Sequence, residues 1–219
     1  MLDQWLKPMT VSLFLRDYLR QQPYARPSAA KDAVRFLGWD SLERILTHYQ
    51  SADVLLVARG KLVSEPVPRS LADARTLMSR GIGLVVRRAE EHDPPLAQLA
   101  SSLTQHIPGQ ANIQLFVTPA GTHGFSWHYD DEEVFIVQTQ GTKDYFFRDN
   151  SLERERRPGK APDFSLSSKE TSPIGTTRLI AGDWLYIPSR WWHVAKCVED
   201  SLSISLGVAP APSWLTTLR

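Results

Sequence analysis

The stretch that decides the fold reads Thr118-Pro-Ala-Gly-Thr-His-Gly-Phe-Ser-Trp-His128-Tyr-Asp130-Asp-Glu-Glu-Val-Phe-Ile-Val137. Side chains alternate between two faces in an extended segment, so His128 and Asp130 are expected to project from the same face. A Gly-rich turn precedes this pair, and a β-branched and aromatic run follows it, which predicts a buried strand. The sequence therefore predicts an imidazole and a carboxylate side by side at the start of a strand.

A third candidate ligand, His193, lies downstream in Ile187-Pro-Ser-Arg-Trp-Trp-His193, after a second strand-like run at 183–187. Two histidines and one carboxylate with open positions form the facial triad typical of non-haem Fe(II) oxygenases. A His-x-Asp pair often arises by chance, and by itself it is also compatible with a solvated turn. The combination predicts a metal site formed by His128, Asp130 and His193.

Two blocks, Thr118–Asp144 and Gly182–His193, resemble the JmjC-type cupins and are most similar to the ribosomal-oxygenase branch of the 2-oxoglutarate-dependent hydroxylases. The resemblance covers the chain from about residue 30 to residue 209. It implies a double-stranded β-helix, or jelly roll, that uses Fe(II), 2-oxoglutarate and O2, with the three metal ligands named above. Relatives usually continue into a dimerisation region and a winged-helix domain, whereas this sequence ends soon after the barrel, so a homodimer stays open.

The resemblance also implies a co-substrate site. Lys143 falls where the family binds the far carboxylate of 2-oxoglutarate, and a buried lysine needs such an anion. In similar proteins a small polar side chain of the last barrel strand helps to hold the co-substrate, a role open to Ser203 or Ser205, although an exposed serine face is an equal alternative. Gln114 and Phe116 fall where relatives often carry Asn and Tyr, so Phe116 lacks a hydroxyl.

Aromatic and acidic residues surround the predicted metal site. We expect the aromatic residues to pack in the core, and the alternative is that they form the wall of a cleft for an extended substrate. The candidate cleft residues are Trp127, Trp191, Trp192 and Tyr145. The acidic run 131–133 is interpreted as a solvated turn, with attraction of a basic substrate group as its alternative role.

Composition narrows the class of protein. With 219 residues and 42% hydrophobic content, the chain can bury a sizeable core as one domain with an annex. A net charge of +1 gives no electrostatic basis for sequence-independent nucleic-acid binding. No apolar run approaches transmembrane length, and the lone Cys197, expected to be a buried thiol, fits a reducing cytoplasm.

The sequence pattern divides the chain into a mixed helical and stranded region at 1–110, a mainly β barrel at 111–210 with a long polar loop at 149–175, and a tail at 211–219. The loop is expected to be a lid or a solvated insertion. Helices are predicted from Thr10 to Leu19, from Ser28 to Gly38, from the capping box Asp40-x-x-Glu43, from Ser70 to Gly81 and from Pro94 to Ile107. Strands are predicted at 53–58, 82–87, 113–118, 133–139, 143–148, 177–180, 184–187, 192–198 and 202–208.

The expected function is hydroxylation of a side chain in a protein or peptide by an Fe(II)- and 2-oxoglutarate-dependent oxygenase. The first alternative keeps this chemistry but acts on a small molecule or a peptide natural product. A non-oxygenase metal-binding cupin would not need Lys143, and a pseudo-enzyme scaffold would normally have lost a metal ligand. The fold by itself does not separate these classes.

Overall fold

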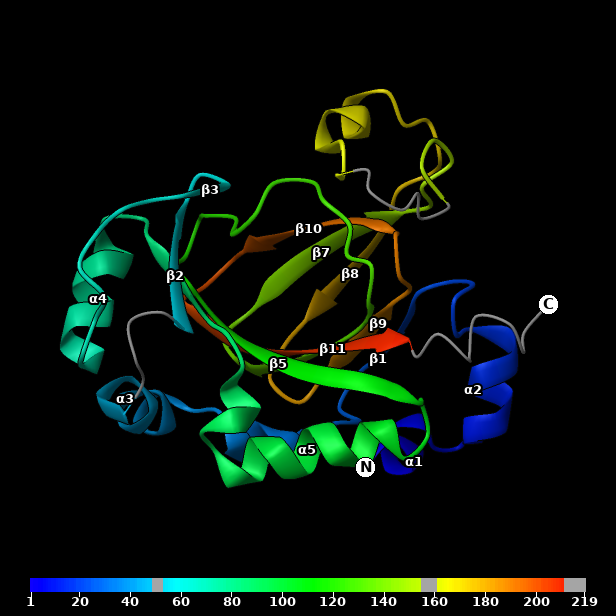
Figure 1. Ribbon diagram of the computed structural model, residues 1–219, viewed down its shortest axis with the longest axis horizontal. Coiled ribbons are helices and arrows are strands. Elements are labelled where there is room, and N and C mark those ends of the chain that lie inside the picture. Colours follow the sequence, from blue (N-terminus) through cyan, green and yellow to red (C-terminus); the bar gives the residue numbers. More distant parts are fainter. Residues whose placement is uncertain (49–52, 155–160, 211–219) are drawn as a thin grey trace.

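Two antiparallel sheets dominate the computed structural model, which describes residues 1–48, 53–154 and 161–210 (Figure 1). The larger, eight-stranded sheet runs in the order β1 (Tyr24–Arg26), β9 (Trp184–Ile187), β6 (Glu133–Gln140), β11 (Ser201–Pro210), β5 (Gly109–Thr118), β4 (Gly83–Val86), β2 (Val54–Ala58), β3 (Lys61–Leu62). The three-stranded sheet runs β10 (Trp192–Cys197), β7 (Lys143–Arg148), β8 (Gly175–Leu179).

Short helices cover the larger sheet and join its strands. They are α1 (Leu2–Leu6), α2 (Val11–Asp17), η1 (Lys31–Phe36), α3 (Trp39–His48), α4 (Leu71–Ser79), η3 (Ala89–Glu91) and α5 (Pro94–Thr104). The 3-10 helix η4 (Phe164–Ser168) lies instead in the loop between β7 and β8 of the smaller sheet. In Figure 1, α5 runs beneath β5 and β11, and α3 and α4 lie near β2. No helix in the described ranges is long and apolar enough to span a membrane.

Alternate residues of β6 face two different cores, which explains why this strand is buried along most of its length. Phe135 and Val137 belong to the large core between the sheet and the helices. Val134 and Ile136 belong to a smaller core inside the barrel, together with Tyr145 of the opposite sheet. This period of two is the alternation expected of strands, and the two facing sheets form the jelly-roll double-stranded β-helix that the sequence predicted.

The region 1–110 buttresses the barrel by extending its larger sheet at both edges. At one edge β1 pairs with β9, and at the other β4 pairs with β5. Helix α2 adds Phe14, whose ring lies 5.1 Å from that of Tyr186 in β9. These strands and the barrel therefore share one continuous core, and the division at residue 110 stays a prediction.

Local helix signals were confirmed where a cap forms. The hydroxyl of Thr10 accepts a hydrogen bond from the backbone N–H of Leu13, and that of Ser70 accepts one from Asp73. Both predicted helices end close to the expected residue, and α5 begins at Pro94 as expected.

The helix predicted at Asp40–Glu43 exists as α3, but the helix start at Ser28 and the capping box at Asp40 were wrong. Ser28 does not cap a helix, because its left-handed φ of 57° lies outside the extended range of an N-cap residue, and only the short 3-10 helix η1 follows. Asp40 does not head a capping box either: α3 already begins at Trp39, and Glu43 accepts from the N–H of Leu71 instead. The sequence also missed α1, β1 and β3.

The loop 149–175 is anchored at its base. Burial opposes ionisation of Glu170, but hydrogen bonds from the Ser151 hydroxyl and from the backbone N–H of Ser172, Ser151 and Thr171 lower the pKa of its carboxyl to about 2. The guanidinium of Arg148 donates to the Glu170 carbonyl. Residues 155–160 and the predicted tail 211–219 lie outside the described residues, and the lid role stays a prediction.

Candidate metal centre

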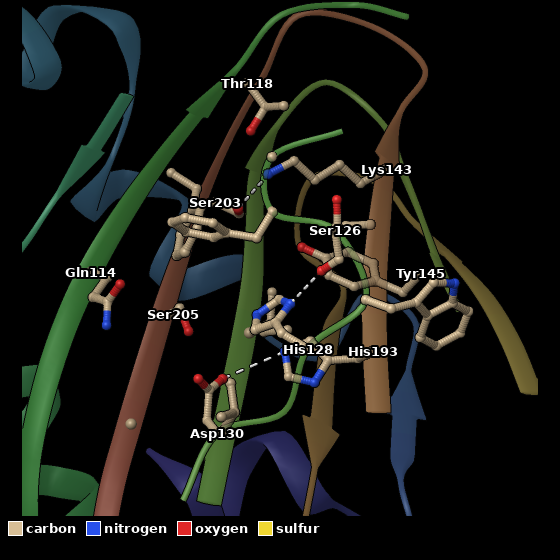
Figure 2. Close-up of a pocket in the computed structure, with 18 of the residues that line it drawn as sticks. Gln114, Thr118, Ser126, His128, Asp130, Lys143, Tyr145, His193, Ser203 and Ser205 are labelled. Carbon is tan, nitrogen blue, oxygen red and sulfur yellow. Dashed lines mark hydrogen bonds and ion pairs between the residues drawn. The ribbon is translucent and has the colours of Figure 1, made fainter. Parts of the chain in front are cut away.

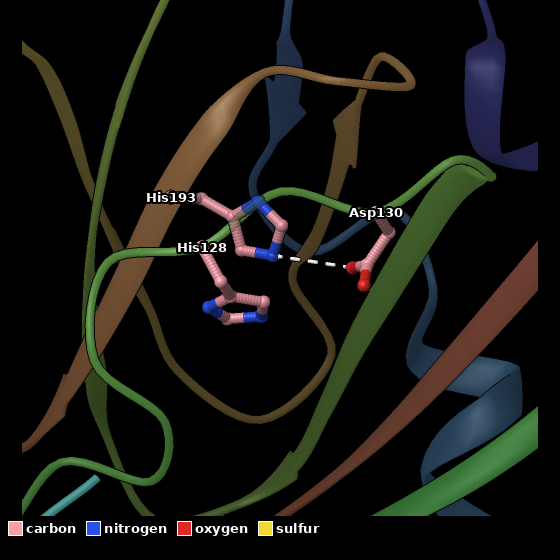
Figure 3. Close-up of side chains that lie close together, drawn as sticks. All are labelled: His128, Asp130 and His193. Carbon is pink, nitrogen blue, oxygen red and sulfur yellow. Dashed lines mark ion pairs between the residues drawn. The ribbon is translucent and has the colours of Figure 1, made fainter. Parts of the chain in front are cut away.

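The three predicted metal ligands come together in space. One ligand atom from each of His128, Asp130 and His193 lies within 4.8 Å of the others, and Figure 3 shows the three side chains converging. His193 Nε2 lies 3.5 Å from Asp130 Oδ2, and the two imidazole ring centroids are 4.3 Å apart. Atoms at these separations can bind one ion.

Backbone hydrogen bonds hold these residues in place. His128 and His193 form an isolated antiparallel bridge between the 124–130 loop and β10. The carbonyl of Asp130 accepts a hydrogen bond of 2.7 Å from the N–H of Arg190, a residue with left-handed φ of 66°. The Arg190 guanidinium also donates to Asp131 at 2.6 Å. All three ligands are thereby fixed to the start of β10.

Each histidine is also fixed in its tautomer. Nδ1 of His128 lies 2.8 Å from the carbonyl of Ser126, and Nδ1 of His193 lies 3.0 Å from that of Trp191. A carbonyl oxygen only accepts, so each Nδ1 carries the proton and each Nε2 keeps a free lone pair. This arrangement is the one in which protein carbonyls orient metal-binding histidines.

Burial keeps His193 neutral. Its removal from water lowers the pKa of the His193 imidazole to about 4, an effect that His128 reinforces and Asp130 opposes. A neutral imidazole is the form that binds a metal. Two imidazoles and a carboxylate fit a divalent first-row transition metal, with open positions left for other ligands.

A pocket of about 420 Å³ opens beside the three ligands, between the two sheets (Figure 2). Most of its wall comes from β5, β6, β7, β10 and β11 and from the 124–130 loop. All five predicted co-substrate residues line it, namely Gln114, Phe116, Lys143, Ser203 and Ser205. The serine face of β11 is therefore turned into the barrel, and the exposed alternative is wrong.

Lys143 is the distinctive group at one end of the pocket. Its side chain is 3% exposed, and its Nζ donates a 2.9 Å hydrogen bond to Ser203 Oγ and lies 5.6 Å from the centre of the Phe116 ring. Burial lowers the pKa of the Lys143 ammonium to about 8. No carboxylate among the described residues pairs with Lys143, so the ammonium fits an anionic group of a ligand.

Tyr145 and Trp127 also line the pocket, whereas Trp191 and Trp192 do not. Trp192 is fully buried against Tyr129, 4.9 Å between ring centroids, because neighbours in a strand point to opposite faces and His193 takes the pocket face. Trp191 packs against the small core inside the barrel. A cleft role for these two residues has no support in the geometry.

The interpretation of run 131–133 as a solvated turn was wrong. Glu133 is 1% exposed and accepts a hydrogen bond from Tyr186, and burial raises the pKa of its carboxyl. Glu132 lines the pocket. The alternation His128-x-Asp130-x-Glu132 was the signal that could have placed Glu132 there.

Two further pocket residues come from distant parts of the chain. Phe164, in the long loop, places its ring 6.3 Å from that of His128 and covers one side of the site. Gly60, in the turn between β2 and β3, forms a bridge with Phe125. No local sequence pattern predicted the contact of Phe164 with His128 or that of Gly60 with Phe125.

Comparison with known proteins shows the family of this chain. The family model described as "JmjC domain" matches residues 88–216. The chain belongs to the JmjC domain family. This JmjC chain is 29% identical over 159 residues to ribosomal oxygenase 1 of Gallus gallus, covering 72% of this chain and 26% of that protein. It is 33% identical over 112 residues to the bifunctional lysine-specific demethylase and histidyl-hydroxylase NO66 of Dictyostelium discoideum, covering 51% of this chain and 22% of that protein.

Solved structures share the JmjC fold. The ribosomal oxygenase YcfD of Escherichia coli in complex with cobalt and succinic acid superposes with a TM-score of 0.69 at 20% identity, over 95% of this chain and 54% of that chain. A second YcfD structure, with cobalt and 2-oxoglutarate, has the same TM-score at 19% identity, over 94% of this chain and 53% of that chain. The present chain thus spans about a quarter of the length of the curated relatives and about half of YcfD.

Proposed function

We propose that this protein is an Fe(II)- and 2-oxoglutarate-dependent oxygenase that hydroxylates a side chain of a protein or peptide. The observation that carries the proposal is the pairing, in one pocket, of an open His–Asp–His triad with a buried lysine that lacks a carboxylate partner among the described residues. A metal at one end and a cation at the other suit a dicarboxylate that chelates the metal and pairs with the lysine.

Different residues of the pocket bind the metal and the co-substrate. His128, Asp130 and His193 would hold the iron, which with bound 2-oxoglutarate and O2 supplies oxidative decarboxylation to succinate and CO2 and the oxidation of a C–H bond. Lys143 and Ser203 form the binding site for the far carboxylate. Burial raises the pKa of the Tyr145 phenol well above its ordinary value, so Tyr145 stays a neutral donor beside them.

The apolar part of the pocket wall serves a second purpose. Val134, Ile136, Ala195 and the rings of Phe116 and Phe125 line it. Such a wall excludes water from the reacting atoms and strengthens the charge interactions inside. The substrate enters past Phe164 and Trp127. The guanidinium carbon of Arg148 lies over the Trp127 ring, 5.0 Å from its centroid.

A polypeptide substrate is the favoured class. The relatives are named ribosomal oxygenase and histidyl-hydroxylase, and the aromatic rim suits an extended chain. A small molecule in the same pocket is the second candidate, since about 420 Å³ accommodates a free amino acid beside 2-oxoglutarate. We place the protein in the cytoplasm on the ground that its lone thiol, Cys197, is buried and free.

One experiment separates these candidates. The iron-loaded protein and 2-oxoglutarate are incubated with a host lysate divided by molecular mass, and products are searched by mass spectrometry for the gain of one oxygen atom in step with succinate release. Oxygen gained by a protein supports the proposal, and oxygen gained only by a low-molecular-mass compound replaces it with the small-molecule alternative. A protein that neither binds 2-oxoglutarate nor releases succinate would be a non-oxygenase cupin.

A further inference from the structure

The side chain of Arg190 contacts the metal-binding segment on the face that points away from the pocket. Side chains alternate along an extended segment, so the two metal ligands His128 and Asp130 share one face and their neighbours share the other. Neither Tyr129 nor Asp131 lines the pocket. These are the two residues that the Arg190 side chain contacts. Arg190 therefore reaches the metal ligands from behind.

The Arg190 guanidinium makes three contacts on that face. Its Nη1 donates a hydrogen bond of 2.6 Å to Asp131 Oδ1, and its central carbon lies 4.5 Å from the centre of the Tyr129 ring. Its Nε and Nη2 both donate to the backbone carbonyl of Glu153, at 2.8 and 2.7 Å. The Arg190 side chain is only 12% exposed, so water competes little with these hydrogen bonds. One side chain thus joins the base of the loop 149–175 to the metal-binding segment.

Tyr129 is enclosed by protein on its other sides, with 3% of its surface exposed. Its hydroxyl donates a 2.7 Å hydrogen bond to Glu153 Oε2. Its ring makes edge-on contacts with Trp192 and Phe164, at 4.9 and 5.5 Å between centroids. Because Tyr129 lies between the two metal ligands of this segment in the chain, fixing its ring also fixes the peptide units that carry them.

The main chain of Arg190 makes one further contact, which can be kept when the side chain is removed. Its N–H donates a hydrogen bond to the carbonyl of Asp130, in a turn where the φ of Arg190 is 66°. Glycine adopts this left-handed conformation without the steric cost that a Cβ brings. The substitution Arg190→Gly therefore suits the backbone and removes only the guanidinium contacts.

We propose that Arg190 is a positioning residue for the metal centre, whose side chain holds His128 and Asp130 in the geometry that binds the ion. It acts through Tyr129 and Asp131 and touches neither the metal nor the co-substrate. This inference rests on the proposed function, because it concerns the metal site of the same pocket. The guanidinium keeps the ligand atoms in place in the metal-free protein, so less ordering entropy is lost when the ion binds.

The positive charge of Arg190 separates positioning from two other roles. A guanidinium that acted on the site only through its charge would repel a metal cation, so its removal would strengthen metal binding. A guanidinium that only stabilised the fold would leave the metal affinity of the folded protein unchanged. Weaker metal binding by a folded variant is expected only from the positioning role.

The test measures metal affinity and needs no turnover. Metal-free wild type and Arg190→Gly are titrated anaerobically with Mn(II) in a calorimeter, at a temperature where urea unfolding shows both proteins to be fully folded. We expect Arg190→Gly to bind Mn(II) about 10- to 100-fold less tightly, the usual effect of removing a group that orients a metal ligand. The electron paramagnetic resonance spectrum of the bound Mn(II) should also change, because it depends on the geometry of the ligands.

Two further variants locate the effect. Arg190→Lys keeps the charge but replaces the planar fork of donors with one ammonium, so its Mn(II) affinity should lie between those of wild type and Arg190→Gly. If Arg190→Gly does not fold, Arg190→Lys decides. The matched control is Arg88→Gly, since Arg88 also has a left-handed φ, of 54°, pairs with the carboxylate of Asp53 and lies outside the pocket. Arg88→Gly should keep the affinity and the spectrum of the wild type.

The possible results are distinct. Unchanged Mn(II) affinity in Arg190→Gly and Arg190→Lys would show a structural role alone and overturn the proposal, and tighter binding would overturn it in favour of a charge effect. An equal loss of affinity in Arg88→Gly would also overturn it. A wild type that binds no Mn(II) would contradict the proposed function together with this inference, whereas equal binding by wild type and Arg190→Gly would leave the proposed function standing.

Discussion

His128 and His193 exchange two backbone hydrogen bonds, 3.1 Å from His128 N to His193 O and 2.8 Å in the reverse direction. The bridge ties the two candidate metal-binding histidines to each other through their main chains, independently of any ion. Their Nε2 atoms are therefore set side by side before a metal arrives, and little ordering entropy remains to be lost on binding.

Replacing any of His128, Asp130 or His193 with alanine is expected to abolish stoichiometric Fe(II) binding. Each removes one of three protein ligands, so the loss should exceed the roughly 10- to 100-fold that follows when only a group orienting a ligand is removed. Metal analysis after anaerobic loading is the measurement. His123→Ala, an exposed histidine of the same loop, is the matched control and should keep its iron. Undiminished iron in a variant would remove that residue from the triad.

Lys143→Ala is expected to weaken 2-oxoglutarate binding by on the order of 100- to 1,000-fold, because it deprives a buried carboxylate of its cation. The 2-oxoglutarate affinity of Lys143→Arg should lie between those of the wild type and Lys143→Ala, since arginine keeps the charge but has a larger side chain. The charge-transfer band of the iron-loaded protein reports the affinity. Lys196→Ala, at an exposed lysine in the neighbouring strand, serves as the control. Equal affinity in wild type and Lys143→Ala would disprove the assignment.

The same lysine should make stability depend on pH. Burial lowers the pKa of Lys143 from 10.5 to about 8. Below pH 8 both states carry the proton, and the folded state bears the full cost of the buried charge; as pH rises toward 10.5 the folded state releases the proton first, so stability increases. The metal-free Lys143→Met variant, whose side chain carries no charge, should have a free energy of unfolding up to about 3 kcal/mol higher than that of the metal-free wild type at neutral pH.

Urea unfolding of the metal-free proteins, repeated from neutral to alkaline pH, measures this difference. The advantage of Lys143→Met should shrink steadily above pH 8, whereas the exposed Lys196→Met should track the wild type throughout. A difference between Lys143→Met and wild type that stays constant over this range would show that Lys143 is not the titrating group.

Gly60→Ala is expected to disturb the metal site from outside it. Gly60 has a φ of 76°, and a Cβ there would collide with Ser126, whose carbonyl orients His128. We expect a loss of about 1–2 kcal/mol in stability from the left-handed backbone and weaker iron binding. Gly38→Ala, where a Cβ meets nothing within 4 Å, is the control. Thermal unfolding and metal titration check both effects, and unchanged iron affinity in Gly60→Ala would separate this turn from the site.

The predictions that the structure confirms rest on sequence patterns within a few neighbouring residues. The spacing of His128 and Asp130 placed them on one face because strand alternation is a local rule, and the hydroxyl caps at Thr10 and Ser70 act within three residues. His193 was nominated from the strand-like run before it and from the triad it completes with His128 and Asp130. The role of Lys143 came through the family resemblance, because nothing in its own neighbourhood separates a ligand from an ordinary strand residue.

Predictions failed where a distant part of the chain competes for a local group. Asp183 accepts the backbone N–H of Ser28, whose left-handed φ of 57° is not that of an N-cap residue, and the expected helix does not start there. The three-residue strand β1 exists only because β9 offers it a partner. Trp192 is close to His193 in sequence but faces the other way, so crowding along the chain did not mean a shared pocket.

The sequence by itself predicted short barrel or sandwich strands from their periodicity and a His–Asp–His metal site from residue spacing and type, and the resemblance to the JmjC-type cupins implied the double-stranded β-helix. The tertiary structure decided what surrounds them: Glu132 lying across Gly207, Phe164 over His128, and Gly60 against the 124–130 loop. These contacts join residues from separate strands and loops, and only the register of the closed barrel fixes which of them meet.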